Sequence, residues 1–157
     1  MTPEQELLSG LAKTTYRLNA QFLGIGEQLA RPAGLTAALW QVLAAVLRAP
    51  LSVADISREI GTTRQSVQRI ADILVEDGLA GYLPNPAHRR AKLLNPTDEG
   101  RAAMRRLGPA HAAFAQRLAD ELTVDVLRDV SVAMTRLSEA LDSLVGTRRD
   151  PPSPSLE

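Results

Sequence analysis

Residues 52–78 constrain the fold most, because they have the pattern of two short helices joined by a tight turn. The first half begins with Ser52, which can cap a helix that has Asp55 at its third position. Apolar residues follow at helical spacing, namely Val53, Ile56 and Ile60. Gly61 then supplies the left-handed conformation in which helices often end. The first half therefore predicts a short helix that stops at a sharp turn.

The second half of this stretch predicts another amphipathic helix. Thr62 and Gln65 fit a capping box at its start, and Gly78 ends it. Its apolar residues recur at the spacing of one helix face, and they are Val67, Ile70, Ala71 and Leu74. Two short helices in this order are typical of a helix-turn-helix.

Polar side chains remain on the outer side of the second helix, near its start. They are Arg64, Gln65, Ser66, Gln68 and Arg69. Side chains of these types bind base edges in the major groove or phosphates of the DNA backbone. The same pattern also fits a capped helix pair in any all-helical protein, so these residues alone leave DNA binding and a purely structural role both open.

The overall charge requires any DNA-binding surface to be local. The chain has 157 residues, the size of one domain, and 45% of them are hydrophobic, which is enough for a buried core. Its 18 basic and 18 acidic residues cancel, so no general attraction to nucleic acid is expected. Between Asn85 and Arg106, however, six basic residues are accompanied by only two acidic ones.

Several classes of function are disfavoured by what the sequence lacks. The absence of cysteine excludes a disulfide framework, a thiolate metal site and a cysteine redox sensor. With only His88 and His111, no glycine-rich phosphate loop and no nucleophile elbow, we predict no enzymatic activity, no metal and no cofactor. The N-terminus lacks a secretory signal and no apolar run approaches the roughly 20 residues of a membrane span, so we expect a cytoplasmic protein without a membrane partner.

The N-terminal region predicts one long helix over residues 3–29, loosened near Gly24 and Gly26. Its positions at helical spacing are Leu7, Leu8, Leu11, Thr15, Leu18, Phe22 and Ile25. This apolar face is broader than a small core requires. It predicts contact with a second subunit, and packing against the C-terminal helices of the same chain is the alternative.

Trp40, the only tryptophan, lies in a second predicted helix that Thr36 caps and that reaches about Arg48. A tryptophan in this place is either a large core anchor or part of the wall of a small-molecule pocket.

A basic hairpin is predicted after the helix-turn-helix. Residues 79–83 and 91–94 have the pattern of two short strands, and the turn-rich loop between them contains Arg89 and Arg90. A hairpin in this position is a wing, whose arginine can enter a minor groove or bind phosphates. A solvated charged hairpin is the alternative.

The C-terminal region predicts two more long helices. Thr97 caps the first, which should bend at Gly108-Pro109. The second covers residues 124–144 with a nearly continuous apolar face, so we expect the two helices to form an oligomerisation arm. Residues 146–157 are rich in Pro, Ser, Arg and Asp and are expected to be disordered.

The order of these parts resembles the MarR family of bacterial winged-helix transcription regulators over residues 7–144. The helical matches lie in residues 35–43, 53–61 and 67–79. The wing, Asn-Pro-Ala-His-Arg-Arg-Ala-Lys from Asn85, is similar to the family pattern D-P-x-D-x-R-A-K, and Arg90 matches the wing arginine of that pattern.

This sequence departs from the family pattern at two places in the wing. Asn85 and His88 stand where the pattern has aspartates, so the carboxylate that would brace the wing arginine is missing. Asn95-Pro96 replaces the usual residues of the second wing strand, and we expect it to shorten that strand because proline cannot donate a hydrogen bond to the sheet.

The resemblance implies a mainly α fold: a winged helix-turn-helix with a small β-hairpin wing and long N- and C-terminal helices that form a dimerisation region. Residues 1–34 and 98–145 would dimerise, and residues 35–97 would form the DNA-binding lobe. The implied function is that of a homodimeric repressor that binds a pseudo-palindromic operator on double-stranded DNA. A helical interaction module without DNA binding is the alternative.

The resemblance also implies site residues. The DNA contacts would be Thr63, Arg64, Gln65, Ser66, Gln68, Arg69, Arg89, Arg90 and Lys92. A small aromatic or phenolic effector would bind between the dimerisation region and the DNA-binding lobe, near Tyr16, Phe22 and Trp40. For each of these aromatic residues, a place in the core is the alternative.

Overall fold

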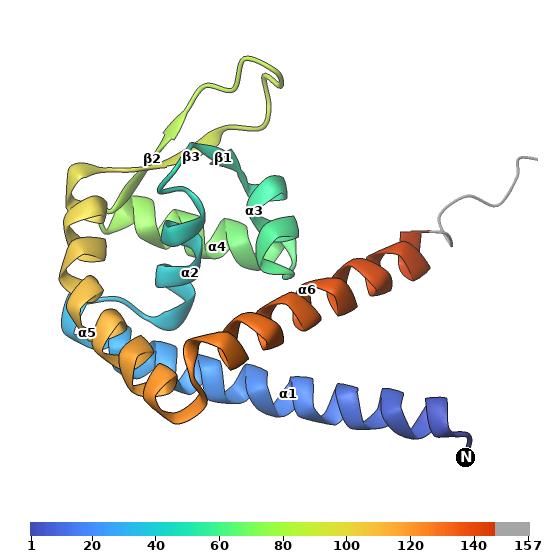
Figure 1. The fold of residues 1–157 in the computed structure, drawn as a ribbon. Coiled ribbons are helices and arrows are strands. Elements are labelled where there is room, and N and C mark those ends of the chain that lie inside the picture. Colours follow the sequence, from blue (N-terminus) through green and yellow to red (C-terminus); the bar gives the residue numbers. More distant parts are fainter. Residues whose placement is uncertain (147–157) are drawn as a thin grey trace, which may run out of the picture. The chain divides into compact units, whose positions relative to one another are not determined.

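In a computed structural model of the chain, residues 1–146 are described. The elements are α1 (Pro3–Ala30), the 3₁₀ helix η1 (Arg31–Ala33), α2 (Ala37–Ala45), β1 (Leu51–Ser52), α3 (Val53–Ile60), α4 (Arg64–Glu76), β2 (Ala80–Leu83), β3 (Leu93–Pro96), α5 (Asp98–Leu122) and α6 (Val124–Gly146) (Figure 1). The strands form one antiparallel sheet in the order β1, β3, β2. The predicted mainly α fold, a winged helix-turn-helix with long N- and C-terminal helices, is confirmed. The predicted disordered tail lies outside the described residues, apart from Gly146, which ends α6.

The chain divides into two compact units, with the boundary inside α5 between His111 and Ala112. The first unit contains every element from α1 to β3 and the first part of α5. The second contains the rest of α5 and α6, and no residue of α6 is buried. No helix within residues 1–146 combines the length and apolarity of a membrane span.

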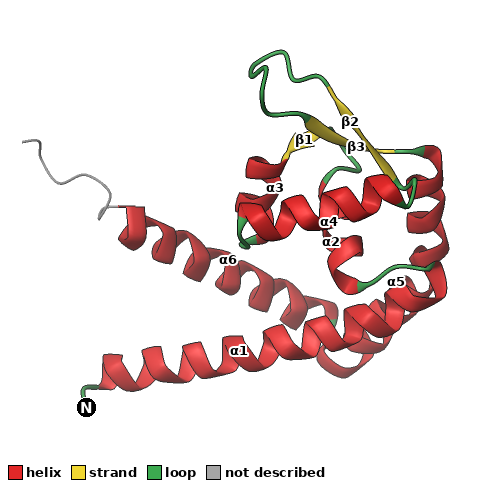
Figure 2. Ribbon diagram, turned by 180° about the vertical axis from the view of Figure 1, so that it is seen from behind, coloured by secondary structure: helices red, strands yellow, loops and turns green. Residues whose placement is uncertain are grey.

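The core of the first unit lies where α2, α3, α4 and the sheet meet. One large side chain from each of these is fully buried: Leu43, Ile56, Leu74 and Leu94. The predicted apolar face of α4 belongs to this core, with Val67 and Ala71 buried and Ile70 half-buried. Seen from behind, the loop between β2 and β3 extends away from the helices as a wing (Figure 2).

The helix-turn-helix forms as predicted, except for one cap. Ser52 Oγ accepts a hydrogen bond from the third residue of α3, and Gly61, with φ of 77°, ends that helix. The predicted cap of α4 is wrong by one residue. Thr63 Oγ1, not the hydroxyl of Thr62, accepts a hydrogen bond from the backbone N–H of Ser66 at 3.1 Å. Adjacent threonines present the same local signal, and the geometry of the turn decides which one serves as the cap.

The cap of α4 can be tested with the two neighbouring threonines. Thr63→Ala is expected to lower the free energy of unfolding by about 1 kcal/mol, because it removes the acceptor of the Ser66 N–H. Thr62→Ala is the matched control, and its expected change is below about 0.5 kcal/mol. Urea unfolding followed by circular dichroism measures both values. Equal losses in the two variants would contradict the cap assigned to Thr63.

α1 is one uninterrupted helix, so the predicted loosening near its glycines is wrong. Gly26 is buried, and a Cβ at this position would lie 3.1 Å from the Cβ of Ala37. The close approach of α1 to α2 therefore explains this glycine. The next residue is Glu27, whose Oε1 accepts a hydrogen bond from the Ala37 N–H at 2.9 Å. A carboxylate of α1 thus binds the positive N-terminal end of α2.

α2 ends at Ala45, earlier than the predicted Arg48. Beyond it, the carbonyl of Leu47 accepts a hydrogen bond from Arg101 Nη1 of α5 at 3.2 Å. The chain then enters β1, in which Leu51 lies opposite Leu94 of β3. The sequence pattern did not predict β1, because two residues are too few to display a strand period.

The wing strands differ from their predicted bounds at the second strand. β3 begins two residues later than expected and continues through Pro96, so the predicted shortening is wrong. Pro96 lies opposite Ala80 at the end of the strand, where its missing N–H does not interrupt the sheet. The next N–H, that of Thr97, donates to the carbonyl of Leu79 at 3.1 Å.

The start of α5 is fastened to the end of α4. As predicted, Thr97 caps α5, with its Oγ1 accepting a hydrogen bond from the Gly100 N–H at 3.1 Å. The same hydroxyl donates to the carbonyl of Gly78 at 2.6 Å. From this anchored end, α5 continues through Pro109 to its last residue, Leu122.

Candidate nucleic-acid interface

The outer face of α4 carries the polar side chains that the sequence singles out as DNA contacts. Four of them are exposed: Arg64, Gln65, Gln68 and Arg69. Ser66 is half-buried at the same end of the helix, and Thr63 stands immediately before it as the N-cap. Because the opposite face is buried in the core, the polar set is presented to solvent on one side of a rigid helix.

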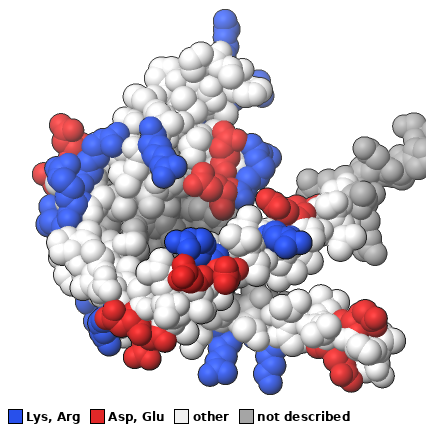
Figure 3. Space-filling model, viewed as in Figure 1, with Lys and Arg blue, Asp and Glu red and all other residues white. Residues whose placement is uncertain are grey.

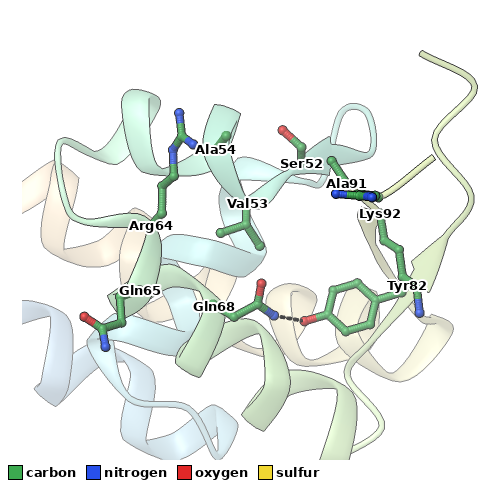
Figure 4. A pocket seen from close by; sticks show the side chains of 10 residues that line it. Ser52, Val53, Ala54, Arg64, Gln65, Gln68, Tyr82, Ala91 and Lys92 are labelled. Atoms are coloured by element: carbon green, nitrogen blue, oxygen red, sulfur yellow. Dashed lines mark hydrogen bonds between the residues drawn. The ribbon is translucent and has the colours of Figure 1, made fainter. Parts of the chain in front are cut away.

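A hollow of about 520 Å³ opens between the start of α3, the start of α4 and the wing hairpin (Figure 4). Of the predicted DNA contacts it brings together Arg64, Gln65, Gln68, Arg90 and Lys92. These residues come from two elements that are separated along the chain, α4 and the wing. The hollow therefore joins the two parts that a winged helix-turn-helix uses to bind DNA.

A second hollow, of about 690 Å³, follows the outer side of α4. The predicted contacts on it are Thr63, Gln65, Ser66, Gln68 and Arg69. Gln65 and Gln68 line both hollows and so form the ridge between them. Arg89 lines neither of these two hollows, and it is exposed in the wing loop.

A hydrogen-bonded group that the sequence did not predict links α4 to the wing. Gln68 Nε2 donates to Asp72 Oδ1 and to Tyr82 Oη, both at 2.9 Å, and Tyr82 Oη donates to Asp72 Oδ1 at 2.6 Å. Burial and the contact with Asp72 raise the pKa of Tyr82 to about 12. Gln68 and Asp72 are four residues apart, so the sequence shows that they are neighbours on one face of α4. It does not show which residue of β2 lies beside them, and the structure is needed to identify Tyr82. We call Gln68, Asp72 and Tyr82 the glutamine network.

The wing loop is organised by Asn85, one of the two departures from the family pattern. Asn85 Oδ1 accepts a hydrogen bond from the Ala87 N–H at 3.0 Å, and its carbonyl accepts from the His88 N–H at 3.3 Å. The amide thus shapes the loop and does not brace Arg90, whose side chain is exposed. Lys92 extends its Nζ over the ring of Tyr82, 6.0 Å from the centroid.

On the face of the molecule seen in Figure 3, positive charge is not gathered into one large patch. Basic and acidic side chains are interspersed there, and basic side chains protrude from the wing at the top of the view. Beside the hollow, Asp55 pairs with Arg58, and the hydrogen bond from Ser52 lowers the pKa of Asp55. The other ion pair in the described part of the chain lies on α6. Within the described residues, the cations of the α4 and wing surface therefore form no ion pair with an acidic side chain.

The three aromatic residues predicted as effector contacts do not form one cluster. Tyr16 and Phe22 are 76% and 58% exposed, so neither lies in the core, which was the alternative prediction for each of them. Trp40 is half-buried and packs edge-on against His111, with 5.5 Å between the ring centroids. The structure thus places Trp40 at the edge of the core and leaves the two rings of α1 open.

Comparison with known proteins agrees with this geometry. The MarR family model matches residues 33–91, which include the helix-turn-helix and most of the wing. An uncharacterised protein of Mycobacterium tuberculosis is 37% identical over 134 residues, covering 85% of this chain and 94% of the relative. The transcriptional activatory protein BadR of Rhodopseudomonas palustris is 25% identical over 146 residues, covering 90% of this chain and 82% of the relative.

Solved structures share the fold at low sequence identity. A mutant of Escherichia coli MarR complexed with operator DNA has a TM-score of 0.73 and 21% identity, covering 87% of this chain and 99% of that one. The M. tuberculosis regulator MosR in complex with DNA has a TM-score of 0.68 and 23% identity, covering 83% and 96%. The chain belongs to the MarR family, whose members are transcription regulators and not enzymes.

Proposed function

We propose that this chain is a homodimeric DNA-binding regulator, and that it is a ligand-responsive repressor of a pseudo-palindromic operator. One observation carries the proposal: α4 turns its polar face outward beside a hollow that the wing cations Arg90 and Lys92 also line. A helix with this face fits the major groove, and a basic wing beside it reaches the flanking minor groove. E. coli MarR in complex with operator DNA and M. tuberculosis MosR in complex with DNA have the same fold, which supports the proposal of DNA binding.

Each predicted contact has a role in this proposal. The exposed residues of α4 bind base edges, and they are Arg64, Gln65, Gln68 and Arg69. Thr63 and Ser66, at the start of the helix, bind phosphates. The wing contributes Arg89, Arg90 and Lys92 to the minor groove and its phosphates. Because the chain as a whole is neutral, affinity rests on these few cations and falls steeply with salt.

Two copies of the chain are proposed to meet through residues 1–34 and 98–145, leaving residues 35–97 as the DNA-binding lobe. Exposed apolar side chains on both α1 and α6 support this division, among them Leu7, Leu11, Val126 and Val130.

A small aromatic or phenolic effector would bind near Trp40. It would bind the dimer more tightly at one spacing of the two α4 helices than at another, and so would shift the dimer toward that spacing. BadR is named an activatory protein, so a promoter-reporter assay is needed to measure the sign of regulation.

Selection from a random pool of DNA duplexes tests the proposal directly. We expect repeated enrichment of an inverted repeat whose half-sites are centred about one helical turn apart. Enrichment of no sequence, with no salt-dependent binding of duplex DNA, would instead support the interaction module that lacks DNA binding.

Arg90→Ala tests whether the wing contributes to the proposed DNA binding. We expect it to weaken binding by about 1–3 kcal/mol on every duplex tested and to reduce the salt slope by about one, because a wing arginine binds backbone and groove and not one base. Arg106→Ala, an exposed arginine of α5 outside both hollows, is the matched control. Fluorescence anisotropy over a salt series measures both variants. Equal affinities for Arg90→Ala and the unmodified chain would remove the wing from the interface.

A further inference from the structure

Tyr82 reaches from the wing to the outer face of α4. Its Oη accepts a hydrogen bond from Gln68 Nε2 at 2.9 Å, the bond drawn in Figure 4, and donates one to Asp72 Oδ1 at 2.6 Å. The ring that carries this hydroxyl is held in place, because Tyr82 packs against the core and lies opposite the fully buried Leu94 of β3. The hydroxyl therefore stands at a fixed position beside two side chains of α4.

The surroundings of Gln68 decide which way its amide faces. An ionised Asp72 offers only acceptors, and the single hydroxyl proton of Tyr82 is donated to Asp72, so the Tyr82 oxygen also accepts. The raised pKa of Tyr82 keeps this proton in place at neutral pH. Both neighbours therefore attract the amide nitrogen, whereas the amide turned over would set Oε1 against the carboxylate of Asp72. The glutamine network thus fixes the direction in which the amide faces.

Holding the amide in this way leaves groups available for a base. Asp72 Oδ1 and Tyr82 Oη are only 2.6 Å apart, so one N–H of Gln68 can point between them and serve both. The other N–H and Oε1 remain, a donor and an acceptor of the kind with which glutamine binds base edges. A glutamine that moves freely on a helix surface has to be ordered when it binds, and this weakens binding by roughly 2- to 10-fold.

Resting on the function proposed above, we infer that Tyr82 is a positioning residue for DNA binding, whose hydroxyl holds the Gln68 amide in the orientation that meets a base edge. Tyr82 is neither a cation nor one of the predicted DNA contacts, and this role requires no contact between Tyr82 and DNA. The role depends entirely on the amide. Loss of the hydroxyl should therefore weaken binding only while residue 68 is a glutamine.

A double-mutant cycle tests this dependence. Tyr82→Phe removes the hydroxyl and keeps the ring, which packs against the core and lies 6.0 Å from Lys92 Nζ. On the selected operator, we expect Tyr82→Phe to weaken binding by about fivefold, because the amide must then be ordered by the DNA. In a chain that already carries Gln68→Met, the same change should alter affinity by less than about twofold. Equal losses in the two backgrounds, or no loss from Tyr82→Phe alone, would overturn the inference.

Base preference gives a readout that a general loss of stability would not change. The base pair whose preference changes in Gln68→Met is the one that Gln68 faces. At that pair we expect Tyr82→Phe to reduce discrimination by about threefold or more, because the freed amide can turn over and exchange its donor and acceptor. Preferences at the other pairs should stay within about twofold. Even weakening by Tyr82→Phe at every pair, or no changed pair in Gln68→Met, would overturn the inference.

α5 offers a matched control for the change at Gln68. Gln116 donates the same kind of hydrogen bond to an aspartate four residues further along, Asp120, with 2.9 Å between Nε2 and Oδ1. Gln116→Met should keep the base preference of the unmodified chain at every pair. Contradictory results on an enriched operator reject the role of Tyr82 alone, whereas failure to enrich any operator would reject the proposed function itself.

Discussion

Gly100→Ala is expected to lower the free energy of unfolding by about 3 kcal/mol, because a side chain at this position has no room. Gly100 is buried in the first turn of α5. A Cβ at this position would lie 2.0 Å from the carbonyl oxygen of Leu79 and 3.3 Å from Leu43 Cδ1. The first distance is far inside van der Waals contact, so the backbone has to shift.

That shift is resisted by the hydrogen bonds around the contact. The Leu79 carbonyl accepts from the Thr97 N–H at 3.1 Å, and the Thr97 hydroxyl binds the carbonyl of Gly78 at 2.6 Å. Moving the backbone at Gly78 and Leu79, or at Thr97, breaks these hydrogen bonds between the end of α4 and the start of α5. Overpacking at this point therefore affects α4 as well as α5.

Gly24→Ala is the control for this prediction. Gly24 is exposed on α1, and a Cβ at this position would have no neighbouring atom within 4 Å. Alanine is the better helix former, so the stability of this variant should stay the same or rise by up to about 1 kcal/mol. Urea unfolding at one fixed protein concentration compares the variants, since a dimer gains stability with concentration. A Gly100→Ala chain as stable as the unmodified one would contradict the close packing of α5 against Leu79.

Val130→Asp is expected to dissociate the proposed dimer and to weaken operator binding by about 100-fold or more, because two linked half-sites are then bound one at a time. The apolar side chains of α6 form one stripe at helical spacing, made of Val126, Leu127, Val130, Met134, Leu137 and Leu141. None of them is buried within the chain, and Val130 is 46% exposed. A charge placed in the centre of such a stripe opposes burial against another subunit.

The same helix provides a matched control. Val132 is also a valine and is 54% exposed, but it lies roughly 200° around the helix from Val130, at about 100° per residue. Val132→Asp should leave the dimer and its operator affinity unchanged. Analytical ultracentrifugation gives the mass of each variant in solution. A dimeric Val130→Asp chain, or dissociation by both substitutions alike, would reject the stripe as the subunit contact.

The parts of the fold that were predictable depend on signals within a few residues of one another. The cap at Ser52 with the glycine at position 61, and the cap at Thr97, each specify a helix end locally, and the structure has them where predicted. The apolar face of α4 is equally local, because helical periodicity repeats every few residues. These signals sufficed to place the polar face of α4 on the outside of the molecule.

The features that the sequence could not predict depend on contacts between distant segments. Just beyond the end of α2, the carbonyl of Leu47 accepts a hydrogen bond from Arg101 of α5. β1 is a strand because it pairs with β3. Tyr82 joins Gln68 and Asp72 only because the wing strand runs beside α4. Periodicity also could not tell whether an apolar side chain on α1, such as Phe22, packs inside its own chain or stays exposed.

The bond between Glu27 and the Ala37 N–H has a mechanical consequence for regulation. It fastens the long first helix to the start of α2 across the short η1 segment, and Gly26 holds the two backbones in close contact. Bending at η1 would break this bond and open that contact. A rotation of α1 at a partner subunit would therefore carry α2 with it, and α2 packs directly on α4. In the proposed dimer, a signal that alters how the two copies meet would therefore change the angle between the two α4 helices.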